Sequence, residues 1–176
     1  MALPAAQSSN PANGSPPSTP MVAGKHEPPP DRFLVGGTTT TPIRTVSQAD
    51  VEEFARLTGD ENPIHLDETY AQRQLFGGPV AHGLLTLSLT LGLWYRAGLF
   101  DGHIVVFRGI DRLQFLKPVR PGDALSAEIT ILRREPSAHG EAVELENATR
   151  NARGEIVLSF SARLLLATPR GAAATL

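Results

Sequence analysis

A first helix is predicted where apolar residues begin to recur every three or four positions, after Ser47. The pattern is carried by Val51, Phe54, Ala55 and Leu57. Ser47, followed three positions later by Asp50, resembles a capping box, which satisfies free N–H groups at a helix start. Gly59 is well placed to end the helix, because glycine readily adopts the left-handed conformation found at helix C-termini. We therefore predict a helix over Gln48–Thr58.

Proline and glycine interrupt the pattern in the segment that follows. Pro63 disfavours helical geometry in the residue before it, so residues 60–65 are predicted to be irregular. Asp67 can cap a second, short helix over residues 68–74. The run F-G-G-P that starts at Phe76 predicts a loop.

The segment 82–98 fits two periods at once. Alternation with small and polar residues, typical of a strand, is carried by Leu85, Leu87, Leu89, Leu91 and Leu93. A stripe at helical spacing is carried by Leu84, Leu87, Leu91 and Trp94. The segment is longer than a typical strand, and leucine is a better helix former than strand former. The pattern therefore favours a helix that is apolar on nearly all sides and buried within a domain.

After Gly102 the pattern changes to extended runs rich in β-branched and aromatic residues. Four runs cover residues 103–115, 124–133, 141–149 and 156–167, and short turns separate them. A weaker strand or edge segment is expected within residues 33–46. Successive strands with short turns imply an antiparallel sheet, and the leucine-rich helix supplies its apolar cover. The predicted fold class is α+β, an antiparallel sheet wrapped around one long central helix.

Composition divides the chain into a tail, a domain and an end. The whole sequence of 176 residues is 41% hydrophobic and 19% charged, which is within the globular range. Residues 1–31 are instead rich in Pro, Ser, Asn, Gly and Ala, and they lack the apolar surface needed to offset the entropy of ordering. We predict a disordered N-terminal tail over 1–31, one domain over 32–168 and a frayed end over 169–176.

Charge and residue usage exclude several classes of function. A formal net charge of -2 argues against nucleic acid or an anionic membrane as the partner. Without cysteine the chain has no disulfides, no thiol nucleophile and no Cys-ligated zinc. No apolar run approaches the roughly 20 residues that span a bilayer, and the N-terminus lacks a secretory pattern. A cytoplasmic protein is expected.

The candidate chemistry lies between Thr58 and Gly83. Asp60 and His65 lie five residues apart on one bent segment, where a carboxylate and an imidazole can act as a proton-transfer pair. Gly83 begins the predicted buried helix, so its backbone N–H can meet a developing negative charge. A metal site formed by Asp60, His65 and His82 matches no standard zinc spacing, and no metal is predicted.

Two segments, T-G-D-E-N-P-I-H-L-D and F-G-G-P-V-A-H-G-L-L, resemble the hydratase signature of the MaoC-like, R-specific enoyl-CoA hydratase family. The later F-L-K-P-V-R-P-G-D-A-L resembles the strand–turn–strand that follows in that family, and the likeness covers about residues 46–166. It implies a hot-dog fold, in which the sheet wraps the central helix. It also implies a homodimer or higher homo-oligomer, with an acyl-pantetheine channel at a subunit interface.

The resemblance implies reversible addition of water to a trans-2-enoyl thioester, giving a (3R)-3-hydroxyacyl product. The carrier would be coenzyme A or an acyl carrier protein of fatty-acid or polyketide metabolism, and no cofactor is expected. Asp60 and His65 match the two catalytic positions, and Gly83 matches the position whose N–H binds the thioester carbonyl. The substrate-binding region is expected to include residues that hold the loop, Asn62 and His82, and residues that line the acyl channel, Tyr70 and Phe76.

One departure keeps alternatives open. Where the family often has a serine on the central helix, this chain has Leu91, and Ser88 and Thr90 are the nearest hydroxyls. A catalytically weak acyl-thioester-binding subunit of a heteromer is therefore retained as an alternative. An acyl-CoA thioesterase is retained as well, because hot-dog proteins also hydrolyse acyl-CoA. The basic residues Arg73, Lys117 and Arg120 are expected either to meet the CoA phosphates or to form a solvated turn.

Overall fold

The computed structural model describes residues 34–100 and 104–167 of the chain. The predicted disordered tail at residues 1–31 and the predicted frayed end at 169–176 lie outside the described residues, and both stay predictions. Within the described residues, no helix is long and apolar enough to cross a membrane.

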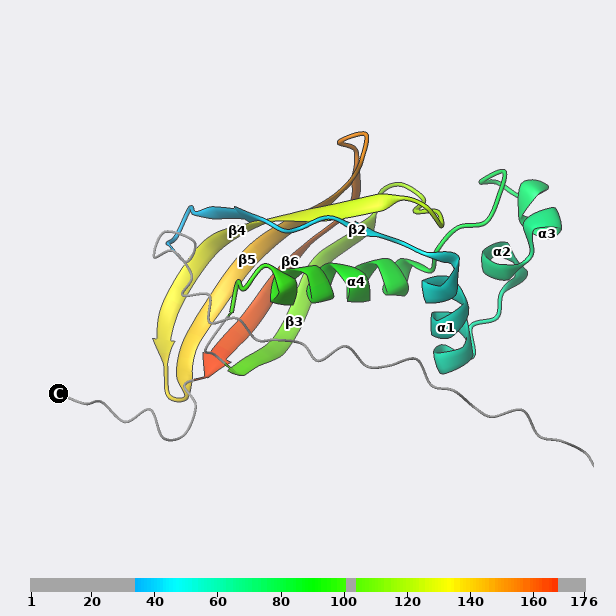
Figure 1. Cartoon of the computed structure of the whole chain (residues 1–176). Helices are drawn as coiled ribbons and strands as arrows, with labels where there is room; N and C mark the ends of the chain where they lie inside the picture. Colours follow the sequence, from blue (N-terminus) through cyan, green and yellow to red (C-terminus); the bar gives the residue numbers. More distant parts are fainter. Residues whose placement is uncertain (1–33, 101–103, 168–176) are drawn as a thin grey trace, which may run out of the picture.

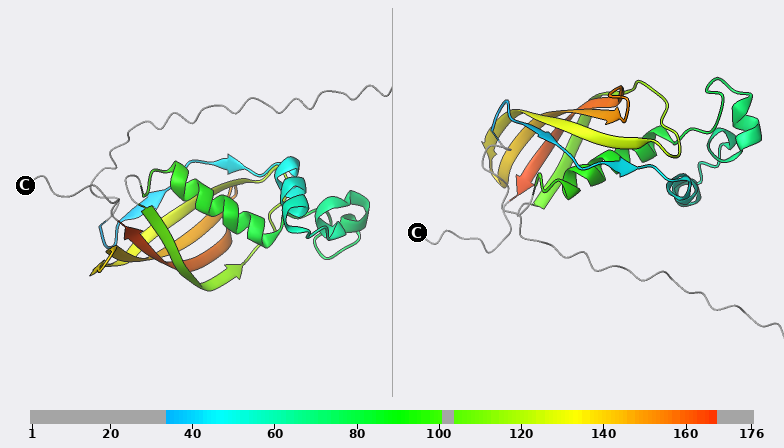
Figure 2. Two further views of the ribbon diagram at one scale, coloured as in Figure 1. Left: turned by 90° about the horizontal axis from the view of Figure 1, so that it is seen from below. Right: turned by 45° about the horizontal axis from the view of Figure 1, so that its top comes forward.

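An antiparallel sheet forms one layer of the structure (Figures 1 and 2). Its strands are β1 (Thr38–Thr40), β2 (Arg44–Thr45), β3 (Ile104–Phe115), β4 (Ala124–Ser137), β5 (Gly140–Asn151) and β6 (Ile156–Ala167). They lie in the order β1-β4-β5-β6-β3, and β2 pairs with β4 beside β1. The four predicted strand runs are confirmed, and the short segment before Val46 forms β1 and β2.

Strand β4 extends past its predicted end. The second predicted run ends at residue 133, but Pro136 pairs with Glu141 and the strand continues to Ser137. Proline removes a backbone donor, so it is tolerated in a strand only where that donor would face an open edge. Strand β1 pairs with β4 only as far as Thr130, which leaves the end of β4 without a neighbouring strand on that side among the described residues.

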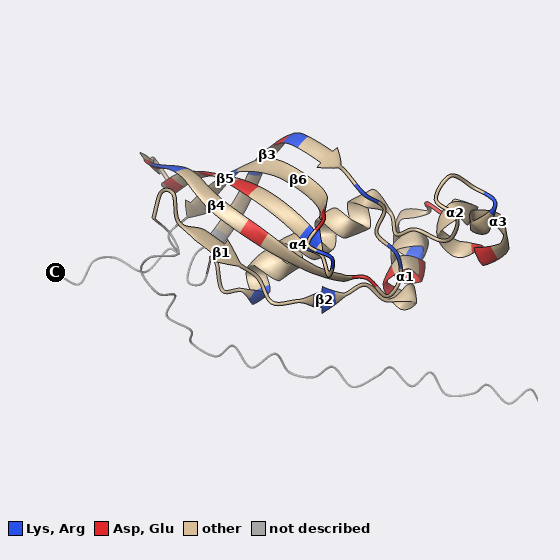
Figure 3. Cartoon of the chain, turned by 90° about the horizontal axis from the view of Figure 1, so that it is seen from above, with Lys and Arg blue, Asp and Glu red and all other residues tan. Residues whose placement is uncertain are grey.

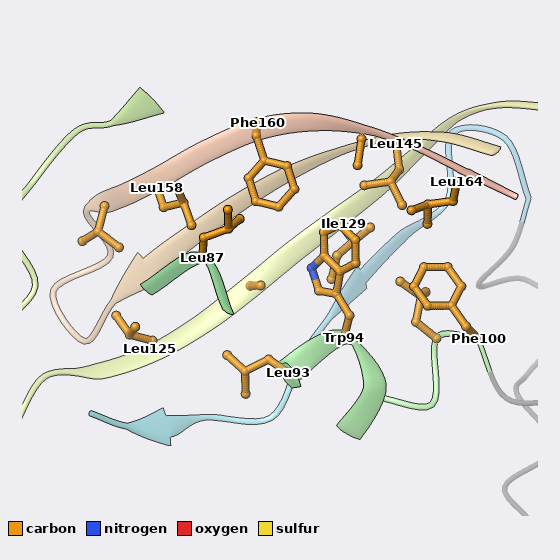
Figure 4. Packing of buried hydrophobic residues seen from close by; sticks show 14 of the residues in the cluster. Leu87, Leu93, Trp94, Phe100, Leu125, Ile129, Leu145, Leu158, Phe160 and Leu164 are labelled. Atoms are coloured by element: carbon orange, nitrogen blue, oxygen red, sulfur yellow. The ribbon is translucent and has the colours of Figure 1, made fainter. Parts of the chain in front are cut away.

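Helix α4 (Gly83–Arg96) lies across the concave face of the sheet and is the centre of the core (Figures 1 and 4). The hydrophobic pattern of residues 82–98 fitted both a strand and a helix, and the predicted helix is confirmed. Trp94 is 2% exposed and packs its indole against Phe160, with ring centroids 5.5 Å apart. Phe100 meets the same indole edge-on at 6.1 Å. Aromatic side chains therefore fill the space between the second half of α4 and the sheet.

A chain of buried hydrogen bonds joins α4 to β5. The Thr90 hydroxyl lies 2.9 Å from the Thr86 carbonyl oxygen, to which it donates, and 3.0 Å from the Thr149 hydroxyl. Asn147 donates to the Thr149 hydroxyl at 3.0 Å and accepts from the Trp94 indole N–H at 2.9 Å. Each polar group has a partner, so the network fixes the position of α4 along β5 without an unsatisfied side chain in it.

Helix α1 (Gln48–Thr58) has the predicted bounds and both predicted ends. Ser47 and Asp50 form a reciprocal capping box at its start. Gly59 has a φ of 77° and donates its N–H to the Ala55 carbonyl, which ends the helix. The local signals read from the sequence are therefore sufficient for this helix.

Two shorter helices follow α1 and partly correct the prediction for residues 60–65. Asn62 is non-helical as expected, but it caps α2 (Pro63–Leu66), so His65 is helical. Proline is compatible with the first position of a helix, where its missing N–H would have had no partner. Asp67 caps α3 (Glu68–Gln72), which ends two residues earlier than predicted. All three short helices lie at the end of the sheet where α4 begins (Figure 1).

Charged residues of both signs are interspersed over α1, α3 and the strands on the face shown in Figure 3. Ion pairs between exposed side chains include Arg163 with Asp111 at 2.9 Å and Arg153 with Glu155 at 2.8 Å. Such exposed pairs contribute little to stability.

The carboxylate of Asp50 is held at the start of α1 by several donors. Burial opposes ionisation, but hydrogen bonds from Ser47 and the neighbouring Arg44 guanidinium outweigh it and lower the pKa of Asp50. A carboxyl group whose pKa is lower in the folded than in the unfolded state stabilises the fold above the unfolded pKa. That stabilisation is lost as the pH falls through the folded value.

We predict that Asp50→Asn lowers the free energy of unfolding by about 1 kcal/mol near neutral pH, because it removes half of the capping box. The difference from wild type should shrink once the pH falls below about 4, the ordinary pKa of an aspartate. Urea unfolding of both proteins at several pH values measures this difference in the free energy of unfolding. Glu53→Gln on the same helix is the charge-matched control. A difference that stayed constant down to acid pH would contradict the role given to the Asp50 carboxylate.

Candidate functional site

The predicted pair Asp60 and His65 is brought together by the turn between α1 and α2. Asp60 follows Gly59 and is exposed, whereas His65 lies in α2 and is half-buried. Asp60, His65 and His82 lie close together. One side-chain oxygen or nitrogen of each lies within 4.8 Å of those of the other two. The Asn62 side chain accepts the Ile64 N–H, so the cap of α2 sets the turn that returns His65 toward Asp60.

One hydrogen bond sets the orientation of the His65 ring. Its Nδ1 lies 2.7 Å from the carbonyl oxygen of Val80, in the loop before α4. A carbonyl oxygen can only accept, so Nδ1 carries a hydrogen and donates it. Nε2 is therefore the ring nitrogen left for a water or a substrate. An imidazole oriented by a backbone carbonyl in this way is suited to proton transfer.

His82 contacts both members of this pair. It is 3% exposed, and its ring centroid lies 3.7 Å from that of His65. Its Nε2 lies 2.9 Å from the backbone carbonyl oxygen of Asp60. While that bond is intact, Nε2 is a donor and is not available as a metal ligand.

Gly83 begins α4 at one wall of a cavity of about 340 Å³. The first N–H groups of an α-helix have no partner within the helix, and the side chain of the preceding residue His82 supplies no cap. The cavity is also lined by His65, Phe76, Thr86, Phe115 and Val157, among others. An imidazole and a helix N-terminus therefore face one small space.

The predicted substrate-binding residues occupy different places around this cavity. Phe76 lines it, and Asn62 and His82 hold the segment that carries Asp60 and His65. Tyr70 lies on α3 with 43% of its surface exposed, and the cavity lining does not include it. Its assignment to the acyl channel stays a prediction.

Several lining residues were not selected from the sequence, among them Thr86, Phe115 and Val157. Thr86 could have been found, because it lies three positions after Gly83 on the same helical face. Phe115 and Val157 come from β3 and β6, and only the pairing of those strands brings them together. No local signal in either strand indicates a position beside Gly83.

Arg120 holds the loop before α4. Its guanidinium donates to the carbonyl oxygen of Pro79 at 3.2 Å and to that of Phe76. The Arg120 side chain is thus engaged by the protein, whereas Lys117 borders the cavity and Arg73 lies exposed at the end of α3. Of the three candidate partners for CoA phosphates, Lys117 lies closest to the predicted chemistry.

The hydroxyls near Leu91 are used within the fold. Ser88 donates to the Leu84 carbonyl at 2.8 Å, and Thr90 belongs to the buried network with Thr149. The hydroxyl that borders the cavity is that of Thr86, which lies 3.3 Å from the His82 carbonyl. Neither Ser88 nor Thr90 therefore takes the place that a serine at position 91 would have.

Comparison with known sequences identifies similar proteins. Residues 34–152 match the family described as MaoC like domain. The chain is 34% identical over 128 residues to protein MaoC of Klebsiella aerogenes, covering 73% of this chain and 38% of that protein. It is 36% identical over 98 residues to the (R)-specific enoyl-CoA hydratase of Rhodospirillum rubrum, covering 54% of this chain and 64% of that enzyme.

A third relative is the 3-hydroxyacyl-thioester dehydratase Z of Mycobacterium tuberculosis. It is 31% identical over 97 residues, covering 54% of this chain and 64% of that enzyme. The chain thus spans less than two thirds of the length of each of these three relatives.

Solved structures with the same fold include the monoamine oxidase regulatory protein from Archaeoglobus fulgius. That structure has a TM-score of 0.70 and 31% identity, and the match covers 77% of this chain and 91% of that one. The MaoC-like dehydratase from Rhodospirillum rubrum has a TM-score of 0.68 and 33% identity, with 77% and 94% covered. These likenesses confirm the predicted hot-dog fold.

Gly83 has little room for a side chain, because a Cβ there would lie 3.0 Å from the Phe115 ring. We predict that Gly83→Ala destabilises the protein by about 1–3 kcal/mol through overpacking. Phe115→Leu in the same chain should recover most of that loss. Urea unfolding of the two single variants and the double variant measures the coupling.

The matched control is Gly92→Ala, on the same helix, where an added Cβ meets nothing within 4 Å. That change should stabilise by about 0.5–1 kcal/mol, because alanine is the better helix former. The close approach of Phe115 would be disproved if Gly83→Ala were as stable as Gly92→Ala.

Proposed function

The chain belongs to the MaoC-like domain family, and we propose that it is an (R)-specific enoyl-thioester hydratase that adds water reversibly to trans-2-enoyl thioesters. The observation that carries this proposal is the convergence of the Asp60 carboxylate and the His65 imidazole beside the Gly83 cavity. The names of two relatives, an enoyl-CoA hydratase and a 3-hydroxyacyl-thioester dehydratase, support this class of hydro-lyase.

In the hydration direction, Asp60 acts as the general base. Its carboxylate takes a proton from water while the water oxygen bonds to C3 of the enoyl group. The electron pair of the C2–C3 double bond moves toward the thioester carbonyl and gives an enolate. The Asp60 side chain is exposed and lies beside His65, so its carboxylate is accessible to a water molecule.

His65 completes the addition. Its Nδ1–H is bonded to Val80, so the imidazolium donates its Nε2 proton to C2 of the enolate. The proton held by Asp60 then returns to His65, which restores both groups. General acid–base assistance of this kind contributes on the order of 10²–10⁴-fold to the rate. The steps balance with water alone, so no cofactor is required.

Gly83 supplies the third group, a backbone N–H for the thioester oxygen. Negative charge develops on the thioester oxygen in the enolate-like transition state, and a backbone N–H at a helix N-terminus carries a partial positive charge. Loss of one such donor costs roughly 2.7–4 kcal/mol of transition-state stabilisation. The position of Gly83 at the start of α4 and at the cavity wall supports this role.

The acyl carrier is either coenzyme A or an acyl carrier protein, because both present the same pantetheine arm. Lys117 borders the cavity and is the basic residue best placed to meet a phosphate at its mouth. Comparison of rates on the CoA and carrier-protein forms of one acyl chain distinguishes the two carriers.

Leu91 favours a second candidate, a catalytically weak subunit that binds acyl thioesters within a heteromer. Ser88 and Thr90 do not replace the absent serine, because both hydroxyls donate within the fold. We place the hydratase first, since His65 and Gly83 line one cavity and the Asp60 carboxylate lies within 4.8 Å of the His65 imidazole.

We predict that Asp60→Asn and His65→Asn each lower the rate of crotonyl-CoA hydration by about 10²–10⁴-fold. Asparagine at 65 keeps a donor near the position of Nδ1, so the bond to Val80 is retained. The loss of enoyl absorbance measures the rate. Glu61→Gln removes the neighbouring exposed carboxylate and should leave the rate within about twofold of wild type.

Equal and negligible activity of wild type and Asp60→Asn, on CoA and carrier-protein thioesters of several chain lengths, would rule out the hydratase. Co-purification of a second hot-dog subunit would then support the binding subunit. Release of free thiol from a saturated acyl-CoA would instead indicate a thioesterase.

A second copy of this chain is proposed to cover the free edge of the sheet at β3. That strand pairs with β6 on one side and with no strand on the other among the described residues. Its first half exposes Val105, Val106 and Phe107, by 38%, 44% and 40%. A long apolar edge strand is a template for pairing with another chain. These features support the expected homodimer.

We predict that wild type has twice the mass of one chain in sedimentation or light-scattering measurements, and that Val106→Lys shifts it toward the monomer. A lysine there would carry an unpaired charge into the interface. Leu132→Lys, which alters a similarly exposed residue on β4, should leave the dimer intact. This interface would be contradicted if wild type were a monomer, or if the Val106→Lys variant remained a dimer.

A further inference from the structure

His82 contacts each of the three groups to which the proposed mechanism assigns a step. Its Nε2 is hydrogen-bonded to the backbone carbonyl oxygen of Asp60, and its ring centroid lies 3.7 Å from that of His65. Its peptide bond leads directly to the N–H of Gly83, and its carbonyl accepts the Thr86 N–H in the first turn of α4. Among the proposed site residues, it is the one that is buried.

The protonation of the ring follows from its contacts. The Asp60 carbonyl can only accept, so Nε2 carries a hydrogen. Nδ1 is buried and has no hydrogen-bond partner among the described residues. A hydrogen on Nδ1 would be buried without an acceptor and would add a positive charge beside His65. The contacts therefore favour the form in which the ring hydrogen is on Nε2 and is donated to the Asp60 carbonyl.

Packing alone does not account for a histidine at this position. The ring is buried and lies near Phe54, whose centroid is 5.0 Å away, and an apolar ring at this position would leave no unpaired nitrogen. A buried polar atom without a partner is unfavourable, so the residue is expected to supply something that an apolar ring cannot. The bond to Asp60 is the polar contact that the ring makes.

Asp60 has few other restraints. Its side chain is exposed, and among the described residues its N–H makes only a long contact of 3.3 Å to the Thr58 hydroxyl. Its backbone carbonyl is held by His82 from the far side of the turn, 22 residues along the chain. Without that donor, α2 would keep its cap at Asn62 and its bonds to Val80, but the Asp60 backbone would lose its hydrogen bond to the residue that precedes α4.

We propose that His82 is a positioning residue, which holds the Asp60 backbone and the His65 ring in register with the N–H of Gly83. The proposal rests on the proposed hydratase function. His82 does not touch the reacting atoms. It acts chiefly through its hydrogen bond to the Asp60 carbonyl, which fixes the segment carrying Asp60 and His65 relative to the helix that binds the carbonyl.

Two substitutions separate the hydrogen bond from the ring. His82→Phe keeps a ring against His65 and loses the donor, and His82→Gln loses the ring and keeps a donor near the position of Nε2. We expect His82→Phe to lower kcat about 10- to 100-fold, because small displacements of catalytic groups have effects of this size. KM should change by less than about threefold, and His82→Gln should recover most of kcat.

A structural role alone would give a different result. Ile129→Val, in the core of β4, is the control for reduced stability and should leave kcat unchanged, with unfolding measured for every variant. The inference is overturned if His82→Phe matches wild type in kcat, or if His82→Gln is as impaired as His82→Phe. Either result, with an active wild type, leaves the proposed hydratase function standing.

A readout independent of activity tests the bond itself. Ring NMR of the histidines should find His82 with its hydrogen on Nε2 and protected from exchange. The Glu61 amide shares its peptide group with the Asp60 carbonyl, so its resonance should shift in His82→Phe and return in His82→Gln. An inactive wild type would contradict the hydratase alone, whereas an unprotected Nε2 hydrogen or an unchanged Glu61 amide would contradict the positioning role.

Discussion

Burial of α4 against the concave face of the sheet is the constraint on which the other features depend. The helix is apolar on most sides, so it remains stable only where the sheet covers it. The hydrogen bonds of Thr90 and Trp94 to β5 add a second condition, because sliding the helix would leave buried polar groups unpaired. Each such group costs about 1–3 kcal/mol. The N-terminus at Gly83 is therefore held at one end of the sheet.

The loops that carry the candidate chemistry are attached to that helix end by backbone contacts. The His65 ring donates to the Val80 carbonyl, and the Ala81 N–H donates to the Val119 carbonyl at 2.7 Å. Arg120 joins the same loop to the turn between β3 and β4. Residues on loops are thus supported by a rigid scaffold, which is the usual arrangement for a functional site.

Strand β3 links the site to the proposed dimer. At its end, Phe115 packs against Gly83 and lines the cavity, while its first half forms the exposed apolar edge. The proposed interface and the cavity residue thus lie at opposite ends of one strand.

The sequence by itself determined what depends on neighbouring residues: the caps and bounds of α1, the runs that became strands, and the Asp60–His65 pair. Periodicity did not decide between strand and helix for residues 82–98, because leucine satisfied both patterns. Only the tertiary structure decided which groups surround Gly83. Phe115 reaches it through strand pairing, and His82 reaches the Asp60 carbonyl across 22 residues. Such contacts depend on how the elements pack, which no local propensity encodes.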